Sequence, residues 1–495
     1  MSDQLKKTNS QYPSLITHHL SLLLCLFLIG CAVNPVTGRN ELMFVSESQE
    51  IQMGKELYPN ALWGAEGGGG EYRDERLKAY LREVIYRLHG VSHRPNLPVD
   101  FAIQNSSTPN AWAIPGHVVI TRGLLAGLDN EAEFAFVMGH EMGHVSARHS
   151  AEQMTSSMLL QVGLAGLGVG LSGKSYSDVA MGLGSVGGSL VLLKYSREHE
   201  LEADRLGVLY MTRLGYDPLN AVSAHRNLER ISREYMKSLG KDSHERSFFE
   251  DLLATHPRTS VRIEELERMI RAAPPAPRSG DGQFRERYRT MTAGLRKVNI
   301  AYRDYYDKAV PAFRKNNLDE ADSLVSKAIS MEKDQPPFYV LKGFILLKRK
   351  DDTEAERNFR SALDLDGNYQ PAYRGLGVLQ YSKDNYSEAA GYLKRALALF
   401  PEDTRSRYFL GMSYFNMRQY SPAVKYLKPF ADAQPRHAEV HGILGVAYEH
   451  LNNPSAAYNE YVLQLRVAPD GELGRYAASR ASYLRSLLER EQKKK

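Results

Sequence analysis

The C-terminal part of the chain repeats with a period of 34 residues, and this period constrains the fold more than any other sequence feature. Small residues recur at this interval in one register at Ala309, Gly343, Gly377, Gly411 and Gly445, and in a second at Ala321, Ala355, Ala389, Ala423 and Ala457. Prolines recur in a third register at Pro401, Pro435 and Pro469. Small side chains are needed where two helices cross closely, and a proline marks the turn before the next unit. The three registers together predict a stack of helix pairs.

The spacings of this periodic region resemble those of the tetratricopeptide repeat. Five units fit between Tyr302 and Gly471. Residues 472–495 are polar and are predicted to form a capping helix and a tail, because a solenoid has to cover the open end of its last repeat. The resemblance implies an α-solenoid that recruits protein clients or an assembly partner.

The length and composition of the chain indicate more than one globular domain. For 495 residues, two or three domains are expected, and 43% hydrophobic residues supply enough core material for them. A net charge of +5 is weak for this length, so we predict no nucleic-acid binding. Prolines and glycines crowd residues 272–282, which predicts a domain boundary. We assign residues 31–272 to the first domain, 273–301 to a linker and leading helix, and 302–471 to the repeats.

The N-terminus has the features of a secretion signal. Both cysteines of the chain lie within its first 31 residues, where a short apolar run from Leu20 to Ile29 follows two lysines. The run ends in Leu28-Ile29-Gly30-Cys31, which resembles a bacterial lipobox. We predict that residues 1–30 are a signal peptide, that Cys31 is lipid-modified, and that the thiol-free mature chain works in the bacterial periplasm. By resemblance to bacterial sorting rules, Ala32 after the cysteine favours the outer membrane. The alternative is an uncleaved anchor with an incidental cysteine.

The first domain contains the sequence His140-Glu141-Met142-Gly143-His144 within a predicted helix. Histidines four residues apart lie on one face of a helix, which is the arrangement that a single Zn²⁺ needs for two imidazole ligands. The glutamate beside the first histidine can activate the attacking water as a general base. Asn130, with Glu133 three residues later, predicts the start of this helix.

A third ligand decides the class of zinc site, because a catalytic zinc has three protein ligands and one open position. In metzincins a third histidine falls six residues after the second, but this chain has Ser150 there. His149 is interpreted as a packing or hydrogen-bonding histidine. Glu200 and Asp204 share a helix face, so the first can bind the metal and the second can accept the spare N–H of a ligand histidine. The alternative for these two acids is a solvated helix face.

An apolar, glycine-rich segment, residues 157–193, lies between the two motifs. Each half of it is short for a membrane span. We predict a buried or groove-lining helical hairpin. The alternative is a segment that dips into the membrane or closes over the active site.

Four motifs of the first domain together resemble the gluzincin metallopeptidases that include the CAAX prenyl proteases, HtpX and BepA-like periplasmic proteases. The motifs are Asn110 to Gly116, His140 to His144, Ser196 to Asp204, and Thr255-His256-Pro257. Residues Asn34 to Arg39 look like the start of lipoprotein members of this family. The resemblance implies a mainly α fold class: an α+β metallopeptidase domain with a small sheet, followed by the α-solenoid.

The resemblance also implies the composition of the metal site. One Zn²⁺ per chain would be held by His140, His144 and Glu200, with Asp204 behind the ligands. Glu141 would be the general base.

An edge strand for substrate is implied within residues 111–121, along which an extended substrate adds as a further strand. The residues assigned to this edge are Asn110, Ala111, Pro115, Gly116 and His117. Members of the family commonly have two glycines after this proline, whereas here His117 follows Gly116. His117 either points to solvent or touches substrate or metal.

His256 precedes a proline in a predicted loop far from both zinc-binding motifs in sequence. In BepA-like members such a histidine can occupy the open position of zinc and keep the enzyme latent, which makes His256 a predicted latch. The alternative is a loop histidine that packs against the domain.

These features predict a membrane-anchored zinc-dependent endopeptidase of the bacterial periplasm. By resemblance, its role is quality control of envelope proteins, with misassembled outer-membrane proteins as substrates and the repeats recruiting substrates or assembly partners. The alternative is a repeat-based chaperone or assembly factor with a latent or inactive protease site. The predicted ligands and base are all present, which favours the enzyme.

Overall fold

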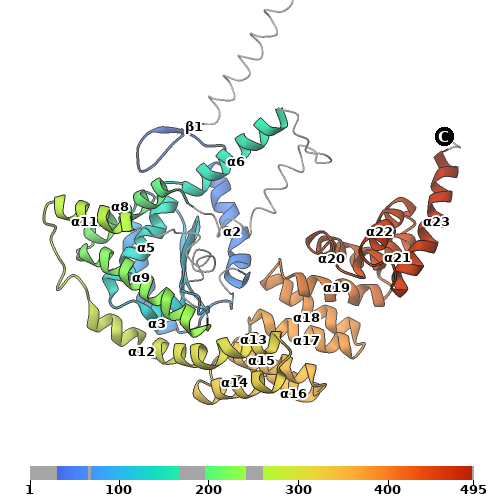
Figure 1. Ribbon diagram of the computed structural model, residues 1–495. Coiled ribbons are helices and arrows are strands. Elements are labelled where there is room, and N and C mark those ends of the chain that lie inside the picture. Colours follow the sequence, from blue (N-terminus) through green and yellow to red (C-terminus); the bar gives the residue numbers. More distant parts are fainter. Residues whose placement is uncertain (1–30, 65–68, 167–194, 241–259, 493–495) are drawn as a thin grey trace, which may run out of the picture. The chain divides into compact units, whose positions relative to one another are not determined.

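The computed structural model describes residues 31–64, 69–166, 195–240 and 260–492 (Figure 1). The predicted signal peptide, most of the apolar segment 157–193, and His256 lie outside these ranges, so those predictions remain untested. The chain divides into two compact units, and the boundary falls between Asn299 and Ile300. Within the described ranges, no helix combines the length and the apolar character needed to cross a membrane.

The first unit surrounds a small sheet with helices (Figure 1). Its strands are β1 (Cys31–Val33), β2 (Asn40–Leu42), β3 (Val99–Gln104), β4 (Ala111–Ile114) and β5 (Gly116–Thr121). Its helices are α2 (Glu47–Gly64), α3 (Glu75–Gly90), α4 (Arg122–Gly127), α5 (Glu131–Ser146), α6 (His149–Gly166), α8 (Arg197–Arg213), α9 (Leu219–Ser238), α11 (Ser260–Ala272) and α12 (Arg285–Ala301).

The central sheet has the strand order β3-β5-β4, with β3 parallel and β4 antiparallel to β5. Side chains alternate between its two faces. Trp112 and Val119, which are opposite each other in the register, join a core cluster with Leu57 of α2. On the other face Phe101 meets Phe134 of α5, with ring centroids 6.2 Å apart. The sheet is therefore packed between α2 and α5, the helix that carries the two predicted histidine ligands (Figure 1).

The segment that was predicted as one edge strand, residues 111–121, forms a hairpin. Only the first of its two strands lies at the edge of the described sheet. Residues 111–114 form β4 at the edge of the described sheet, Pro115 makes the turn, and β5 runs back through the middle between β3 and β4. Gly116 and His117 therefore lie on a central strand, which corrects their assignment to the edge. The reason is the reversal at Pro115, where the following Gly116 adopts φ +97°, a backbone conformation that glycine tolerates well.

Helices α5 and α8 cross closely because small residues face each other. A Cβ at Gly207 would lie 3.0 Å from the backbone nitrogen of His140, and a Cβ at Gly143 would lie 3.2 Å from Cα of Ala203. Larger side chains at either position would push the two helices apart. The glycines thus bring the histidine motif of α5 against the acidic motif of α8.

The predicted linker is attached to the first unit. Residues 273–284 form no helix or strand, but the backbone nitrogen of Ser279 donates to the carbonyl of Gly215 at 2.9 Å. Helix α12, predicted to lead into the repeats, packs on this unit: the buried hydroxyl of Tyr288 donates to the Leu125 carbonyl at 2.8 Å. The leading helix is therefore a part of the first unit, because its apolar face is buried there.

The second unit consists of paired helices, as the period of the sequence predicts. It begins with the π-helix η3 (Tyr302–Tyr306), which continues into α13 (Asp307–Arg314). The remaining helices are α14 (Leu318–Met331), α15 (Pro336–Lys348), α16 (Asp352–Leu365), α17 (Gln370–Ser382), α18 (Tyr386–Leu399), α19 (Thr404–Asn416), α20 (Tyr420–Ala433), α21 (Val440–His450), α22 (Pro454–Val467) and α23 (Glu472–Gln492). The second helices of the five pairs begin 34 residues apart, and α23 follows as the predicted capping helix.

The turn within each repeat has a residue with positive φ. These residues also recur every 34 positions, at Asn316, Lys350, Asp384, Arg418 and Asn452, with φ between 54° and 62°. The small residues lie where the paired helices touch: a Cβ at Gly377 of α17 would lie 2.6 Å from Cγ of Leu393 on α18. The repeat signal in the sequence thus corresponds to one turn geometry and one close helix contact per repeat.

We expect Gly377→Ala to destabilise the repeat unit by about 1–3 kcal/mol, because the new methyl group overlaps Leu393. Gly391→Ala on α18 is the matched control, since no atom lies within 4 Å of its added Cβ and alanine favours the helix by about 0.5–1 kcal/mol. Urea unfolding followed by far-UV circular dichroism measures both changes. If the free energy of unfolding changed by the same amount in both variants, the close-contact explanation would be contradicted.

Candidate metal centre

Three potential metal ligands converge from two helices. Side-chain caps fix the start of each helix: Asn130 accepts from the backbone nitrogen of Glu133 at 2.9 Å, as predicted, and Ser196 accepts from that of His199 at 3.2 Å. The ligands themselves are buried, and one ligand atom from each of them lies within 4.8 Å of the others. These residues are His140, His144 and Glu200.

The spacing of these atoms fits a zinc ion. The Nε2 atoms of His140 and His144 are 3.2 Å apart. The Glu200 carboxylate is 3.4 Å from Nε2 of His144 through Oε1 and 3.6 Å from Nε2 of His140 through Oε2. Two ligand atoms at zinc distances on a tetrahedral ion lie about 3.3–3.4 Å from each other. Two imidazoles and one carboxylate at this spacing form a donor set for one zinc with a further position for water or substrate.

Asp204 lies behind His140, where it was predicted. Its Oδ1 is 2.9 Å from Nδ1 of His140, which leaves Nε2 of that ring on the ligand side. Arg262 of α11 binds Asp204 through two hydrogen bonds of 2.7 and 2.6 Å, and Nε2 of His225 on α9 lies 3.4 Å from the same carboxylate. Arg262 also reaches Oε2 of Glu200 at 2.6 Å. The guanidinium therefore holds two buried carboxylates at once.

The charges in this cluster set the protonation states that ligation needs. Burial alone would raise the pKa of Asp204, but Arg262 and His225 outweigh burial and hold that pKa well below its usual range. Burial lowers the pKa of His140 to about 4, against the opposing effect of Asp204. Asp204 is thus a carboxylate and His140 is a neutral imidazole near neutral pH, as a ligand histidine must be.

A second group of residues lies behind His144. The Tyr195 ring stacks on the His144 ring with centroids 3.9 Å apart, and its hydroxyl is 3.0 Å from Oγ of Ser150. Nδ1 of His149 is 2.8 Å from Nδ1 of His144, and Nε2 of His149 is 3.2 Å from Oε2 of Glu202. The hydrogen bond from His149 lowers the pKa of Glu202. The interpretation of His149 as a hydrogen-bonding histidine is confirmed.

Glu141, the predicted general base, lies on α5 beside the first histidine and is 4% exposed. Burial raises the pKa of Tyr195, and the negative charges of Glu141 and Glu200 contribute to this shift. Glu141 thus directly follows the predicted ligand His140 on the same buried helix.

The predicted edge residues lie on the hairpin next to α5, which packs against β4. Asn110 precedes β4 and is fixed by Thr121, whose hydroxyl accepts from the Asn110 backbone nitrogen at 2.9 Å. Ala111 begins the strand. His117 points to neither bulk solvent nor the ligand cluster: its ring stacks on Tyr58 of α2 with centroids 3.9 Å apart, and burial lowers its pKa.

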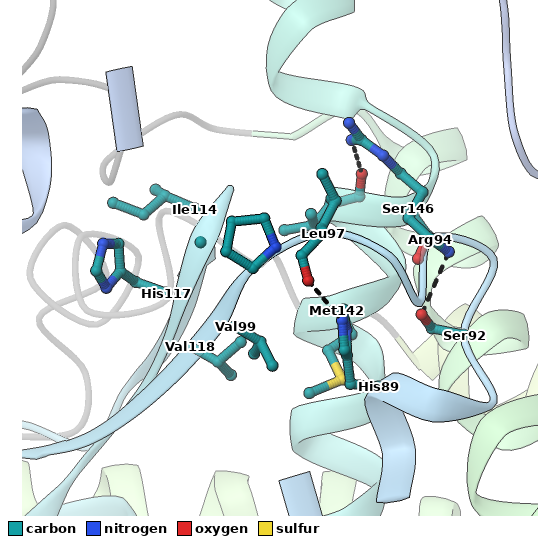
Figure 2. A pocket seen from close by; sticks show the side chains of 13 residues that line it. His89, Ser92, Arg94, Leu97, Val99, Ile114, His117, Val118, Met142 and Ser146 are labelled. Atoms are coloured by element: carbon teal, nitrogen blue, oxygen red, sulfur yellow. Dashed lines mark hydrogen bonds between the residues drawn. The ribbon is translucent and has the colours of Figure 1, made fainter. Parts of the chain in front are cut away.

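A small cavity lies between the hairpin and α5, on the side away from the metal ligands. Figure 2 shows His117 and Ile114 at one side of it and Met142 of α5 at the other. Met142 is two residues after His140, so its side chain leaves the helix about 200° further round. The cavity therefore lies on the opposite face of α5 and is separate from the metal site.

Four residues that support the ligands were not predicted as part of the site: Arg262, His225, Tyr195 and Glu202. Arg262 and His225 come from α11 and α9, and the sequence gives no spacing rule that links them to Asp204. Tyr195 directly precedes the recognised Ser196 to Asp204 motif, so extending that motif by one residue would have included it.

Comparison with known proteins agrees with this geometry. Residues 71–270 match the model of peptidase family M48, and residues 346–404 and 380–446 match two tetratricopeptide repeat models. The chain is 28% identical over 245 residues to the mitochondrial metalloendopeptidase OMA1 of Schizosaccharomyces pombe, covering 48% of this chain and 65% of that protein. It is 25% identical over 321 residues to the β-barrel assembly-enhancing protease of Escherichia coli K12, covering 60% and 63%. The chain thus spans less than two thirds of the length of either relative.

Among solved structures, the chain is similar to YrrB, a TPR protein described as having an unusual peptide-binding site. The TM-score is 0.31 at 23% identity, over 36% of this chain and 91% of that one. It is also similar to PilF of Pseudomonas aeruginosa, with a TM-score of 0.34 at 17% identity, over 39% and 92% of the two chains. Together, the family matches and the ligand geometry establish that this chain carries a peptidase family M48 domain followed by tetratricopeptide repeats.

Proposed function

We propose that this protein is a zinc-dependent endopeptidase whose metal is held by His140, His144 and Glu200. The observation that carries the proposal is the convergence of these three buried side chains at zinc spacing, with Glu141 next to the first ligand. The match of this region to peptidase family M48, whose relatives include metalloendopeptidases, supports it.

The chain's own residues account for the acid–base steps. When bound, zinc would supply a Lewis acid for the scissile carbonyl and for the attacking water. Glu141 takes one proton from the water while the water oxygen forms a bond to the carbonyl carbon. It then gives a proton to the leaving amine as the C–N bond breaks. Arg262 and Asp204 keep Glu200 and His140 in place during this cycle.

Substrate is proposed to bind as an extended strand along β4. This strand is the edge of the described sheet and packs against α5. Its unpaired backbone groups can bond to a substrate strand beside the helix that carries Glu141. Recognition through backbone groups suits misassembled β-sheet proteins, which expose unpaired strand edges.

We further propose that the protein acts in the periplasm, attached to the outer membrane by a lipid on Cys31. The lipobox-like sequence before Cys31 supports this, and β1 begins at this residue, so an anchor there would join the folded domain directly. We also propose a role in the quality control of outer-membrane proteins, and the likeness to the β-barrel assembly-enhancing protease supports it. The repeats would recruit clients or an assembly partner.

Metal removal tests the proposed activity. We expect the purified protein to contain about one zinc per chain and to cleave casein. A chelator should abolish cleavage because it removes the Lewis acid, and added zinc should restore it. His144→Ala is expected to bind no zinc at this site and to stay inactive after zinc is added. If the zinc-loaded protein bound clients but did not cleave them, the proposed endopeptidase activity would be contradicted. A repeat-based assembly factor would then be favoured.

A further inference from the structure

We propose that His149 and Glu202 form a hydrogen-bonded relay that orients His144 for zinc and strengthens zinc binding. The proposal rests on the zinc site proposed above and extends it to two residues outside the ligand set. The relay runs from the ligand helix α5 through the start of α6 to α8. It consists of two hydrogen bonds: one joins Nδ1 of His144 to Nδ1 of His149, and the other joins Nε2 of His149 to Oε2 of Glu202.

The geometry fixes the direction of each hydrogen bond once zinc is bound. Nε2 of His144 faces His140 and Glu200, so its lone pair goes to the metal and the ring proton stays on Nδ1. This Nδ1–H donates to Nδ1 of His149 across 2.8 Å. Because Nδ1 of His149 accepts this bond, the ring proton of His149 lies on Nε2 and is donated to Glu202 across 3.2 Å. Each of the two histidines thus has one proton to donate and one partner to accept it.

The break between α5 and α6 makes this contact possible. In a continuous helix His149 would point about 140° away from His144, because they are five residues apart. Helix α5 instead ends at Ser146, and Arg148 adopts a positive φ of 60° before α6 begins. Arg148 donates to Glu50 at 3.0 Å and to the carbonyl of Val45 at 2.7 Å, which anchors the helix break. The turn thus returns His149 to the side of His144.

Burial supports a role in the site. His149 is 1% exposed, and its ring lies between two others: it stacks on His199 with centroids 4.1 Å apart and meets His144 edge to face at 4.9 Å. A ring held in this way cannot rotate to another partner without losing both contacts. A hydrogen-bond partner of a ligand histidine fixes its tautomer and raises its basicity, and removal of such partners typically weakens metal binding 10–100-fold.

The test is the zinc dissociation constant of the purified protein, measured by competition with a chromophoric chelator. His149→Phe keeps a stacked ring but removes both nitrogens, and we expect it to bind zinc about 10–100-fold more weakly. Glu202→Ala, at the half-buried end of the relay, should weaken zinc binding in the same direction. Glu202→Gln should recover part of the loss because its amide oxygen still accepts from His149. His441→Phe is the matched control: this buried histidine of the repeats is also bonded to a glutamate, Glu460, and its replacement should leave the zinc affinity unchanged.

Two further results distinguish a relay from simple packing. Adding Glu202→Ala to His149→Phe should cause no further weakening, because the relay is already broken. In ¹⁵N spectra of zinc-loaded protein, His149 should carry its proton on Nε2. If both His149→Phe and Glu202→Ala bound zinc with wild-type affinity, the relay would be wrong and the proposed zinc site would stand. A wild-type protein that binds no zinc would overturn the zinc site, and the relay would be lost with it.

Discussion

Replacing Glu141 by glutamine is expected to lower the rate of peptide cleavage by a factor of about 10²–10⁴ while zinc remains bound. Glutamine has nearly the shape of glutamate but cannot take a proton from the attacking water. The three ligand side chains are unchanged, so the metal content should stay at the wild-type value. Casein or peptide cleavage and zinc content, measured on the same preparations, separate the loss of the base from the loss of the metal.

Glu198→Gln is the matched control for this experiment. Glu198 is an exposed glutamate in the first turn of α8, away from the buried ligand face. Its replacement should leave cleavage and zinc content unchanged. Cleavage by Glu141→Gln at the wild-type rate would refute the role of Glu141 as the base, whereas loss of zinc from that variant would show that Glu141 helps to hold the metal.

Replacing Arg262 by methionine is expected to destabilise the first unit by about 3–5 kcal/mol in the absence of zinc. Arg262 is 3% exposed and binds both Asp204 and Glu200, whose own exposures are 1%. Methionine fills much of the same volume but leaves two buried carboxylates without their counter-charge. Bound zinc would offset part of the charge on Glu200, so the destabilisation should be smaller in the zinc-loaded protein.

Tryptophan fluorescence isolates this effect to one unit. The chain has two tryptophans, Trp63 and Trp112, and both lie in the first unit. Urea unfolding followed by fluorescence therefore reports on the metallopeptidase unit, while circular dichroism reports on the helices of both units. Arg268→Met on the same helix is the control: Arg268 is exposed and pairs with Glu265 at the surface, so its loss should not move the midpoint. If Arg262→Met had the same urea midpoint as the wild-type protein, the structural role of the buried guanidinium would be contradicted.

Local sequence patterns, together with the family resemblance, predicted the three side chains that converge as candidate metal ligands. His140 and His144, and likewise Glu200 and Asp204, are four residues apart in helices, so each pair shares a face wherever the helix packs. The start of each helix was also readable, because a cap depends on residues three positions apart. Periodicity predicted the helix pairs of the repeat unit for the same reason: each repeat makes the same contact with its neighbour.

Turns and helix breaks could not be predicted from local patterns in the same way. Residues 111–121 were predicted as one edge strand, but the turn at Pro115 divides them into an edge strand and a central strand. His149 was interpreted as a packing or hydrogen-bonding histidine, but its partner could not be named, because only the helix break at Arg148 brings it to His144. Strand order and helix breaks depend on what packs on each side of the chain, and here Arg148 is anchored by Glu50, far earlier in the sequence.

The sequence by itself determined which side chains converge as candidate metal ligands, the repeat period and the order of the two units, because these depend on spacings within one helix or one repeat. Only the tertiary structure decided which residues surround the ligands. Arg262 and His225 meet Asp204 from helices that are distant in sequence, and His149 meets Glu202 across two helices. Such contacts arise because buried charges and ring nitrogens must find partners within the folded core, and no local spacing states which partners those are.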